Sequence, residues 1–163
     1  MVNEVIYNNS SQIDSTDRIR NHTPASFNQK IDAQLTEQLH HYANQSKSSI
    51  SERIEALKHE WDIERILELN ASSLAFIGVI LTLTIDRSWL WLTGVVLVFL
   101  FQHSVQGWCP PLPVFRRFGV RTRSEIDWEK FALKTLRGDF NSLPPESESA
   151  AVRVDRVQHL IKS

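Results

Sequence analysis

Apolar residues are concentrated in one internal segment of the chain, residues 66–108. Residues 66–85 contain a single charged side chain, Glu68, and residues 89–108 contain none. A helix of about 20 apolar residues crosses the roughly 30 Å hydrocarbon core of a bilayer. Asp86 and Arg87 separate two such lengths by a connection so short that the helices must run antiparallel. The pattern predicts an all-α membrane protein, with a two-span antiparallel transmembrane helical hairpin and cytoplasmic flanking helices.

Amphipathic helices are predicted before the hairpin. Apolar residues at helical spacing predict one helix from Pro24 to about Gln45, with Thr23 as its N-cap. A second helix is predicted to start at a capping box formed by Ser49 and Glu52 and to continue without a break into the apolar segment. Its apolar stripe consists of Ile50, Ile54, Leu57 and Trp61. This stripe is typical either of an ordinary buried helix face or of a short dimerising coiled coil.

The region after the hairpin begins with prolines. They should end the second span at Cys109 and keep residues 110–113 extended. A capping box of Thr122 and Glu125 then predicts a helix to about Arg137, with Gly138 as its C-cap. The basic and aromatic residues of this helix suit either an anionic membrane surface or a soluble amphipathic helix. Apolar residues at helical spacing in the C-terminal tail are Ala150, Val154, Val157 and Ile161.

These patterns divide the chain into five segments. They are a flexible tail (1–22), amphipathic helices (23–65), the hairpin (66–108), a juxtamembrane exit with its helix (109–140), and a linker with a short C-terminal helix (141–163). The alternative for the middle segment is a hairpin buried in a soluble bundle. That alternative needs a large amphipathic shell, and the flanking segments supply only short apolar faces.

The distribution of basic residues predicts the orientation of the hairpin. Basic residues near its outer ends are Arg53, Lys58, Arg65, Arg116, Arg117, Arg121 and Arg123. The turn has only Arg87, and positive charge is enriched on the cytoplasmic side. Trp89 and Trp91 at the turn and Trp108 at the other end suit the two membrane interfaces. We therefore expect a multi-pass protein of a bacterial inner membrane with both termini in the cytoplasm.

Composition and motifs argue against several classes of function. The formal net charge is −1 over 163 residues, without the positive excess that drives nucleic-acid binding. Cys109 is the single cysteine, so an internal disulfide or a multi-cysteine zinc site is not expected. The polar N-terminus lacks the basic and apolar regions of a secretory signal peptide. There is no recognisable catalytic or phosphate-binding motif, and no cofactor is predicted.

Two features inside the hairpin are candidates for function. A strip of small residues, Ala71, Ala75, Gly78 and Thr82, allows close helix approach, either to Gly94 on the second span or to a second hairpin. Polar residues fall at one depth near the cytoplasmic ends of both spans. They are Glu68, Asn70, Gln102, His103, Ser104 and Gln106. This polar cluster is an ion or proton site, an interhelical hydrogen-bonded clamp, or a set of side chains that simply snorkel towards the lipid headgroups.

The hairpin and its exit resemble a known family. The sequence "DIERILELNASSLA" and the exit of Gly107, Trp108, Cys109 and Pro110 are similar to those of the YgaP-like transmembrane domain family, bacterial inner-membrane hairpins of unknown function. In some relatives the hairpin is fused to a rhodanese domain. The single cysteine and the missing α/β pattern give no reason to expect sulfurtransferase activity here.

Two functions are predicted from these features. The first is a non-enzymatic, self-associating membrane anchor or interaction module. Its expected partners are the lipid bilayer, a second copy of the chain and an unidentified cytoplasmic protein. The alternative is a thiol site at the membrane interface, centred on Cys109, which neighbouring Arg116 and Arg117 would activate if they folded back towards it.

Overall fold

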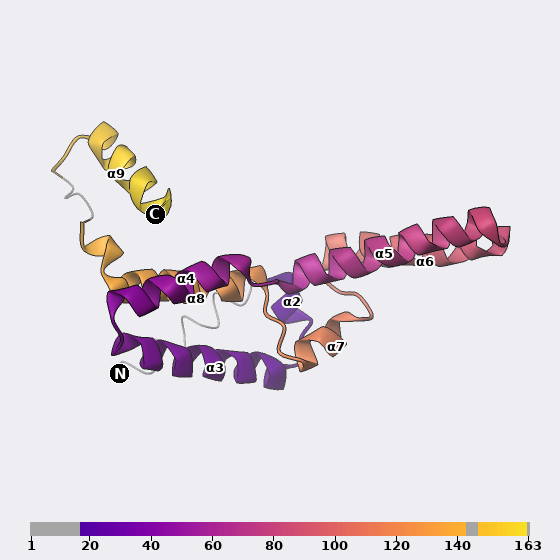
Figure 1. The fold of residues 1–163 in the computed structure, drawn as a ribbon, viewed down its shortest axis with the longest axis horizontal. Helices are drawn as coiled ribbons and strands as arrows, with labels where there is room; N and C mark the ends of the chain where they lie inside the picture. Colours follow the sequence, from indigo (N-terminus) through magenta and orange to yellow (C-terminus); the bar gives the residue numbers. More distant parts are fainter. Residues whose placement is uncertain (1–16, 143–146, 163) are drawn as a thin grey trace. The chain divides into compact units, whose positions relative to one another are not determined.

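The computed structural model describes residues 17–142 and 147–162, whose regular structure is helical, without β-strands in those ranges. The helices are α2 (Arg18–Asn21), α3 (Ala25–Ala43), α4 (Lys47–His59), α5 (Ile63–Thr84), α6 (Leu90–Gln106), α7 (Leu112–Arg117), α8 (Arg123–Arg137) and α9 (Ala150–Lys162), with 3-10 helices η1 (Arg87–Trp89) and η2 (Asp139–Ser142) (Figure 1). Two compact units are present. One comprises Met1–Gln34 and Trp61–Ile126, and the other Leu35–Glu60 and Asp127–Ser163.

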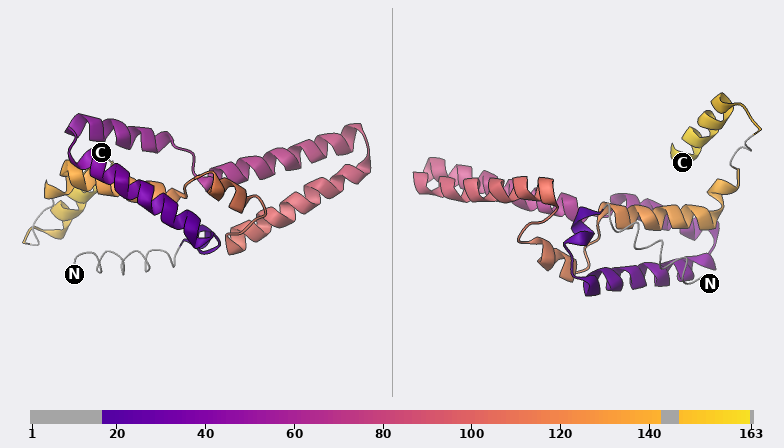
Figure 2. Two further views of the ribbon diagram at one scale, coloured as in Figure 1. Left: turned by 90° about the horizontal axis from the view of Figure 1, so that it is seen from below. Right: turned by 180° about the vertical axis from the view of Figure 1, so that it is seen from behind.

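The first unit contains two helices long and apolar enough to cross a membrane, within Lys47–Thr84 and Arg87–Gln106. Only 11% and 6% of their most apolar stretches are buried, so most of these apolar residues lie at the surface of the structure. They correspond to α5 and α6, which lie side by side (Figures 1 and 2). At the connection, Asp86 Oδ1 accepts a hydrogen bond from Ser88 N (2.8 Å). The prediction of an all-α chain with two long apolar helices is confirmed.

The helix before α5 differs from the predicted one in two ways. Its cap is Ser46, whose hydroxyl accepts from Ser49 N (3.2 Å), so the capping box predicted at Ser49 is wrong. The chain also leaves helical geometry after His59, and Asp62 caps α5 by accepting from Arg65 N at 2.7 Å. Because the Asp62 carboxylate satisfies a terminal N–H of α5, this helix can begin on its own and need not continue from α4.

The predicted apolar stripe of α4 is largely a core face. Ile50, Ile54 and Leu57 are buried, whereas Trp61 follows the helix end and is 45% exposed. The guanidinium of Arg65 lies 4.1 Å from the Trp61 ring centre, a cation–π contact. Most of the stripe therefore packs inside the protein, in agreement with its interpretation as an ordinary buried helix face.

The predicted flexible N-terminal tail extends too far, because its last residues are helical. The expected flexible tail reaches residue 22, and residues 1–16 lie outside the described part. Residues 18–21, however, form α2, whose N-cap Asp17 accepts from Ile19 N and Arg20 N. Thr23 does not cap α3; its hydroxyl donates to Ile19 O (2.8 Å). Two buried residues of α2 therefore join the core instead of remaining in solvent.

The prolines after Cys109 are not extended as predicted. Pro111 has φ −76° and ψ −13° and precedes α7, with Pro113 in its first turn. The fixed φ of proline suits the first helical turn, where the missing N–H costs nothing. Leu112, the first residue of α7, is fully buried. The exit therefore turns immediately into a short helix.

The start and end of α8 match the sequence prediction. Glu125 N donates to Thr122 Oγ1 (3.2 Å), and Thr122 N donates to Glu125 Oε2 (2.8 Å), a complete capping box. Gly138 follows the helix with φ 90°. In the second unit, Arg53 Nε binds Glu129 Oε1 at 2.8 Å, and Glu129 is fully buried. This paired charge connects α4 to α8.

Candidate functional site

At Gly78, α5 packs tightly against α6. A Cβ at Gly78 would overlap the hydroxyl of Thr93 and lie 3.2 Å from its backbone N. The same hydroxyl donates to Ala75 O (3.2 Å) across the helix pair. The predicted partner Gly94 is wrong, since a Cβ there would meet nothing within 4 Å. The small-residue strip thus packs at Ala75 and Gly78 against α6 of the same chain.

The C-terminal end of α6 lies at the base of the α5/α6 pair, by which we mean the end opposite the turn. It is held there by the N-terminal helix α2. Arg18 Nη1 donates to Ser104 O (2.9 Å) and Val105 O (3.3 Å). A cation at this position complements the negative end of the helix dipole and satisfies terminal carbonyl groups. Gly107 ends α6 with φ 78°, and its N–H donates to His103 O (2.7 Å). Sequence reasoning missed Arg18, because it lies far away in a polar segment without periodicity.

Cys109 lies in the hydrophobic core at this base. It is 5% exposed and clusters with Ile19, Ile63, Leu67 and Leu112. Burial raises the pKa of the thiol, although a hydrogen bond from Leu112 N acts in the opposite direction. The nearby Arg116 does not approach as an activator, because its guanidinium binds other groups. The environment of Cys109 therefore favours the neutral thiol.

A buried ion-pair network joins α2, α3, α7 and α8. Arg116 Nη1 and Nη2 bind Glu125 at 2.7 Å and 2.8 Å, and Nη2 also binds Asn28 Oδ1 at 2.6 Å. Arg20 binds the same Glu125 and forms a bidentate pair with Asp32 (3.0 Å and 2.9 Å). Two guanidinium groups face two carboxylates, so the charges balance. The Glu125 carboxylate thus closes the capping box of α8 and binds Arg116, nine residues away, and Arg20, 105 residues away.

The predicted polar cluster separates into distinct groups. Gln102 and Gln106 contact each other along α6 (3.4 Å). Glu68 and His103 line one open polar groove of about 430 Å³, together with Arg18 and Glu64. Asn70 lines a different, apolar pocket, to which His103 also contributes. The structure therefore places Glu68 and His103 on one groove, and Gln102 and Gln106 elsewhere.

The polar groove is lined by charged side chains but, in the described part of the chain, has no arrangement typical of a metal site. His103 Nδ1 is buried without a hydrogen-bond partner in the described structure. The Glu64 carboxylate accepts from Arg123 N at 3.2 Å. Among residues 17–142 and 147–162 there is no group of three metal-ligating side chains arranged for a metal ion. Ser104 contributes its carbonyl to Arg18, and its hydroxyl donates to Leu100 O (3.0 Å).

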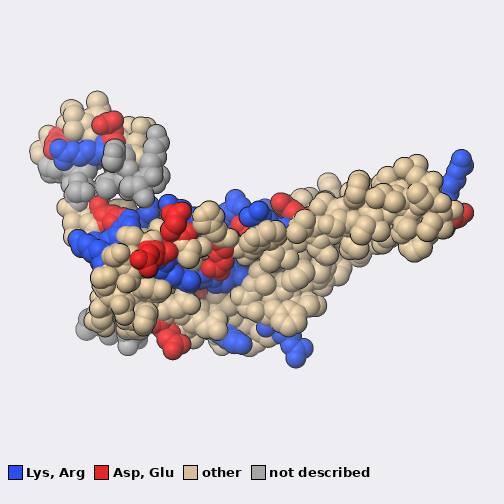
Figure 3. Space-filling model, viewed as in Figure 1, with Lys and Arg blue, Asp and Glu red and all other residues tan. Residues whose placement is uncertain are grey.

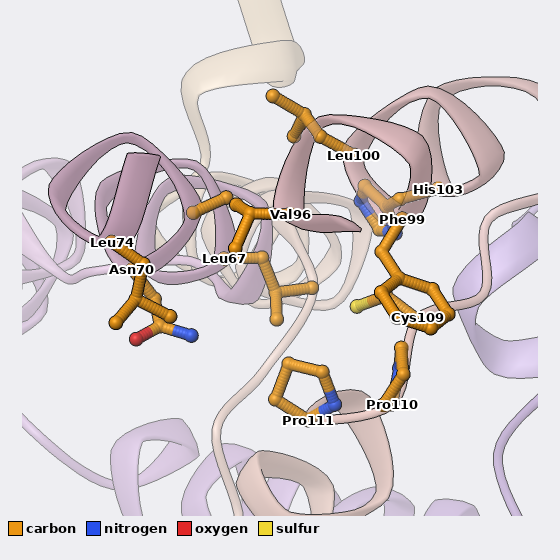
Figure 4. Close-up of a pocket in the computed structure, with 11 residues that line it drawn as sticks. Leu67, Asn70, Leu74, Val96, Phe99, Leu100, His103, Cys109, Pro110 and Pro111 are labelled. Atoms are coloured by element: carbon orange, nitrogen blue, oxygen red, sulfur yellow. The ribbon is translucent and has the colours of Figure 1, made fainter. Parts of the chain in front are cut away.

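The apolar pocket lies between the bases of α5 and α6 (Figure 4). Its volume is about 170 Å³. The residues that come from the exit motif are Cys109, Pro110 and Pro111. Trp108 packs against the neighbouring core instead. The exit motif thus closes the helix, supplies a core residue and forms one wall of a pocket.

The basic residues of α8 are engaged with acids. Arg123 binds Asp62 Oδ2 (3.1 Å), Lys130 binds Asp127 (2.8 Å), and Arg137 forms a bidentate pair with Asp139. Such pairing reduces the charge available to an anionic membrane surface. Phe131 is nevertheless 60% exposed. On α9, Ala150, Val154 and Val157 are exposed, and the side chain of Ile161 lies outside the described residues.

Comparison of the chain with protein-family models, with curated proteins and with solved structures found no match.

Proposed function

We propose that the chain is an integral membrane protein in which α5, η1 and α6 form an antiparallel transmembrane hairpin. Its role is that of a non-enzymatic anchor. The hairpin holds a helical base on the cytoplasmic side for interaction with a protein partner. The proposal includes the family resemblance of the hairpin and its Gly-Trp-Cys-Pro exit to YgaP-like transmembrane domains.

The observation that carries this proposal is the exposed apolar surface of α5 and α6. Large side chains that are more than 65% exposed include Phe76, Leu83, Trp91, Val98 and Phe101. Figure 3 shows charged groups at the far tip of the pair, where the sequence has Asp86 and Arg87, and little charge between tip and base. Exposure of this much apolar surface to water is unfavourable, whereas hydrocarbon solvates it.

The proposed orientation rests on the distribution of basic residues. Arg65 and Arg117 flank the base, and Arg87 alone lies at the turn. Cytoplasmic loops carry the excess of arginine and lysine, so the base is on the cytoplasmic side of a bacterial inner membrane. Trp89 and Trp91 then lie at the opposite interface.

The base has the character of a folded support. Arg116 and Glu125 are 1% exposed and form a bidentate ion pair, and Arg18 binds the end of α6. Buried bidentate pairs impose specific geometry on the elements that they join. A hairpin so connected can hold cytoplasmic helices at the membrane, which supports an anchoring function.

Gly78 packs against Thr93 within the chain, which favours self-association through a surface other than the small-residue strip. A homodimer stays a prediction, without a defined interface. The thiol alternative is supported less, because Cys109 is buried and its pKa is raised by that burial.

Membrane insertion and orientation can be tested with single cysteines in a Cys109→Ser background. Ser88→Cys at the turn and Ser48→Cys in α4 are the two reporters. In right-side-out vesicles, a membrane-impermeant maleimide should label only the turn; in inverted vesicles it should label only α4. The reverse result would refute the orientation. Release of the protein by alkaline carbonate would refute the membrane hairpin itself.

A further inference from the structure

The pocket between α5 and α6 is built from one face of each helix. From α5 it is lined by Leu67, Asn70, Ala71 and Leu74. From α6 it is lined by Val96, Phe99, Leu100 and His103. Both sets follow the i, i+3, i+4, i+7 spacing of a single helix face. We infer that this pocket binds one acyl chain of a membrane phospholipid, an inference that rests on the proposed insertion of the hairpin.

The pocket exists because the two helices touch at one end and separate at the other. They pack tightly at Gly78 and Thr93, and they diverge from the turn towards the base (Figure 2). At the base, Cys109, Pro110 and Pro111 form one wall of the pocket (Figure 4). Arg18 holds the end of α6 in place by its bonds to two carbonyl groups. The separation is therefore a fixed feature of this helix pair.

The size of the pocket selects its occupant. Its volume of about 170 Å³ compares with the engineered apolar cavity of about 150 Å³ that binds benzene, a ligand of six carbons. A helix of a second copy is about 10 Å wide and cannot enter. An extended acyl chain is narrow enough, and the surrounding bilayer supplies it at high local concentration.

The positions of polar and apolar residues in the pocket lining set the direction in which the acyl chain lies. His103 lies at the base end of the α6 face, and Asn70 is the polar residue of the α5 face. Leu74 and Val96 are further towards the turn, so the lining is apolar in the deeper part. The polar end of the lipid therefore lies near His103 and Asn70, and its methylene groups run towards Leu74 and Val96. Each lining face extends over seven residues of helix, which corresponds to about 10 Å along the acyl chain.

Photo-crosslinking of the full chain in vesicles tests this site. The vesicles contain phosphatidylethanolamine and phosphatidylglycerol, with a trace of phosphatidylcholine that carries a diazirine midway along one acyl chain. After irradiation, mass spectrometry should find the most frequent adducts at Leu74 and Val96. Ala71→Phe should fill the pocket and remove these adducts. Ser73→Phe, at an exposed position of the same helix, should leave them unchanged.

Flotation of the vesicles separates this inference from the proposed function. If the protein floats with the vesicles but adducts are spread evenly over exposed residues such as Phe76 and Phe101, and Ala71→Phe changes nothing, the pocket site is refuted and the hairpin stands. If the protein does not float, the membrane hairpin is refuted as well. Concentration of adducts in the pocket of the wild-type protein supports the site even if Ala71→Phe fails to fold.

Discussion

Arg18 and Gly107 are in direct contact at the end of α6, and the contact leaves no space for a side chain on the glycine. A Cβ at Gly107 would lie 2.5 Å from Arg18 Cβ and 3.1 Å from its carbonyl carbon. Gly107 also has φ 78°, a left-handed conformation that other residues adopt at a cost. Two independent constraints thus act on one residue of the exit motif.

Gly107→Ala should destabilise the protein more than Gly119→Ala does. Gly119 has φ 81° with nothing within 4 Å of its Cβ position, so its substitution measures the backbone cost alone, about 1–2 kcal/mol. The additional loss at Gly107 measures the Arg18 contact. Thermal unfolding in detergent micelles would report both. Equal losses would show that the contact with Arg18 imposes no constraint.

Gly78→Val should weaken the packing of α5 against α6, because the new side chain would displace Thr93. Overpacking of this kind costs roughly 1–3 kcal/mol. Gly94→Val is the matched control, since its Cβ position is open. Thermal unfolding gives the stability, and light scattering gives the oligomer mass. A loss of oligomer mass with unchanged stability would show instead that the strip serves a second copy.

Arg116→Met should be strongly destabilising, and Arg117→Met nearly neutral. Arg116 is 1% exposed and pairs with Glu125, whereas Arg117 is exposed. Breaking a buried pair by removing one partner typically costs about 3–5 kcal/mol, and exposed substitutions usually cost less than about 0.5 kcal/mol. Denaturation of the two variants in the same detergent provides the comparison. Similar stabilities would refute a structural role for this network.

Asp17 should make the fold sensitive to acid. Burial would raise its pKa, but hydrogen bonds from Ser124, Arg20 N, Thr122 and Ile19 N together lower it. The folded pKa is therefore below the unfolded value of about 3.9, and the stabilisation present at neutral pH is lost as the pH falls below about 5. Asp17→Asn should flatten this part of the stability profile. Because other carboxylates titrate in the same pH range, the difference between wild type and variant is the quantity to measure.

Local patterns predicted one N-cap correctly, at Thr122, and misplaced two others, at Thr23 and Ser49. Thr122 and Glu125 define the start of α8 by themselves, since both partners lie within one turn. Ser46 and Ser49 both suit an N-cap, and only the folded chain shows that Ser46 is used. Periodicity therefore finds a helix more reliably than its first residue.

The packing register could not be predicted to the residue. Spacing placed Gly94 opposite Gly78, but the adjacent Thr93 lies there. Successive residues of an α-helix are rotated by about 100°, so an error of one position selects another face. Arg20 was missed for a different reason. Its partner Glu125 is 105 residues away, and no local pattern connects the two.

Cys109 should react slowly with maleimide, with a midpoint above the usual thiol pKa of about 8.5. The thiol is buried among Ile63, Leu67 and Leu112, and burial raises its pKa. Ser48→Cys in a Cys109→Ser background is the exposed control and should react with an ordinary midpoint. The measurement is the rate of alkylation against pH in detergent. A midpoint well below 8.5 at Cys109 would mean that an electropositive group reaches the thiol in solution, and would favour the thiol function over the anchor. A raised midpoint with slow labelling would agree with a cysteine that packs at the base of the hairpin.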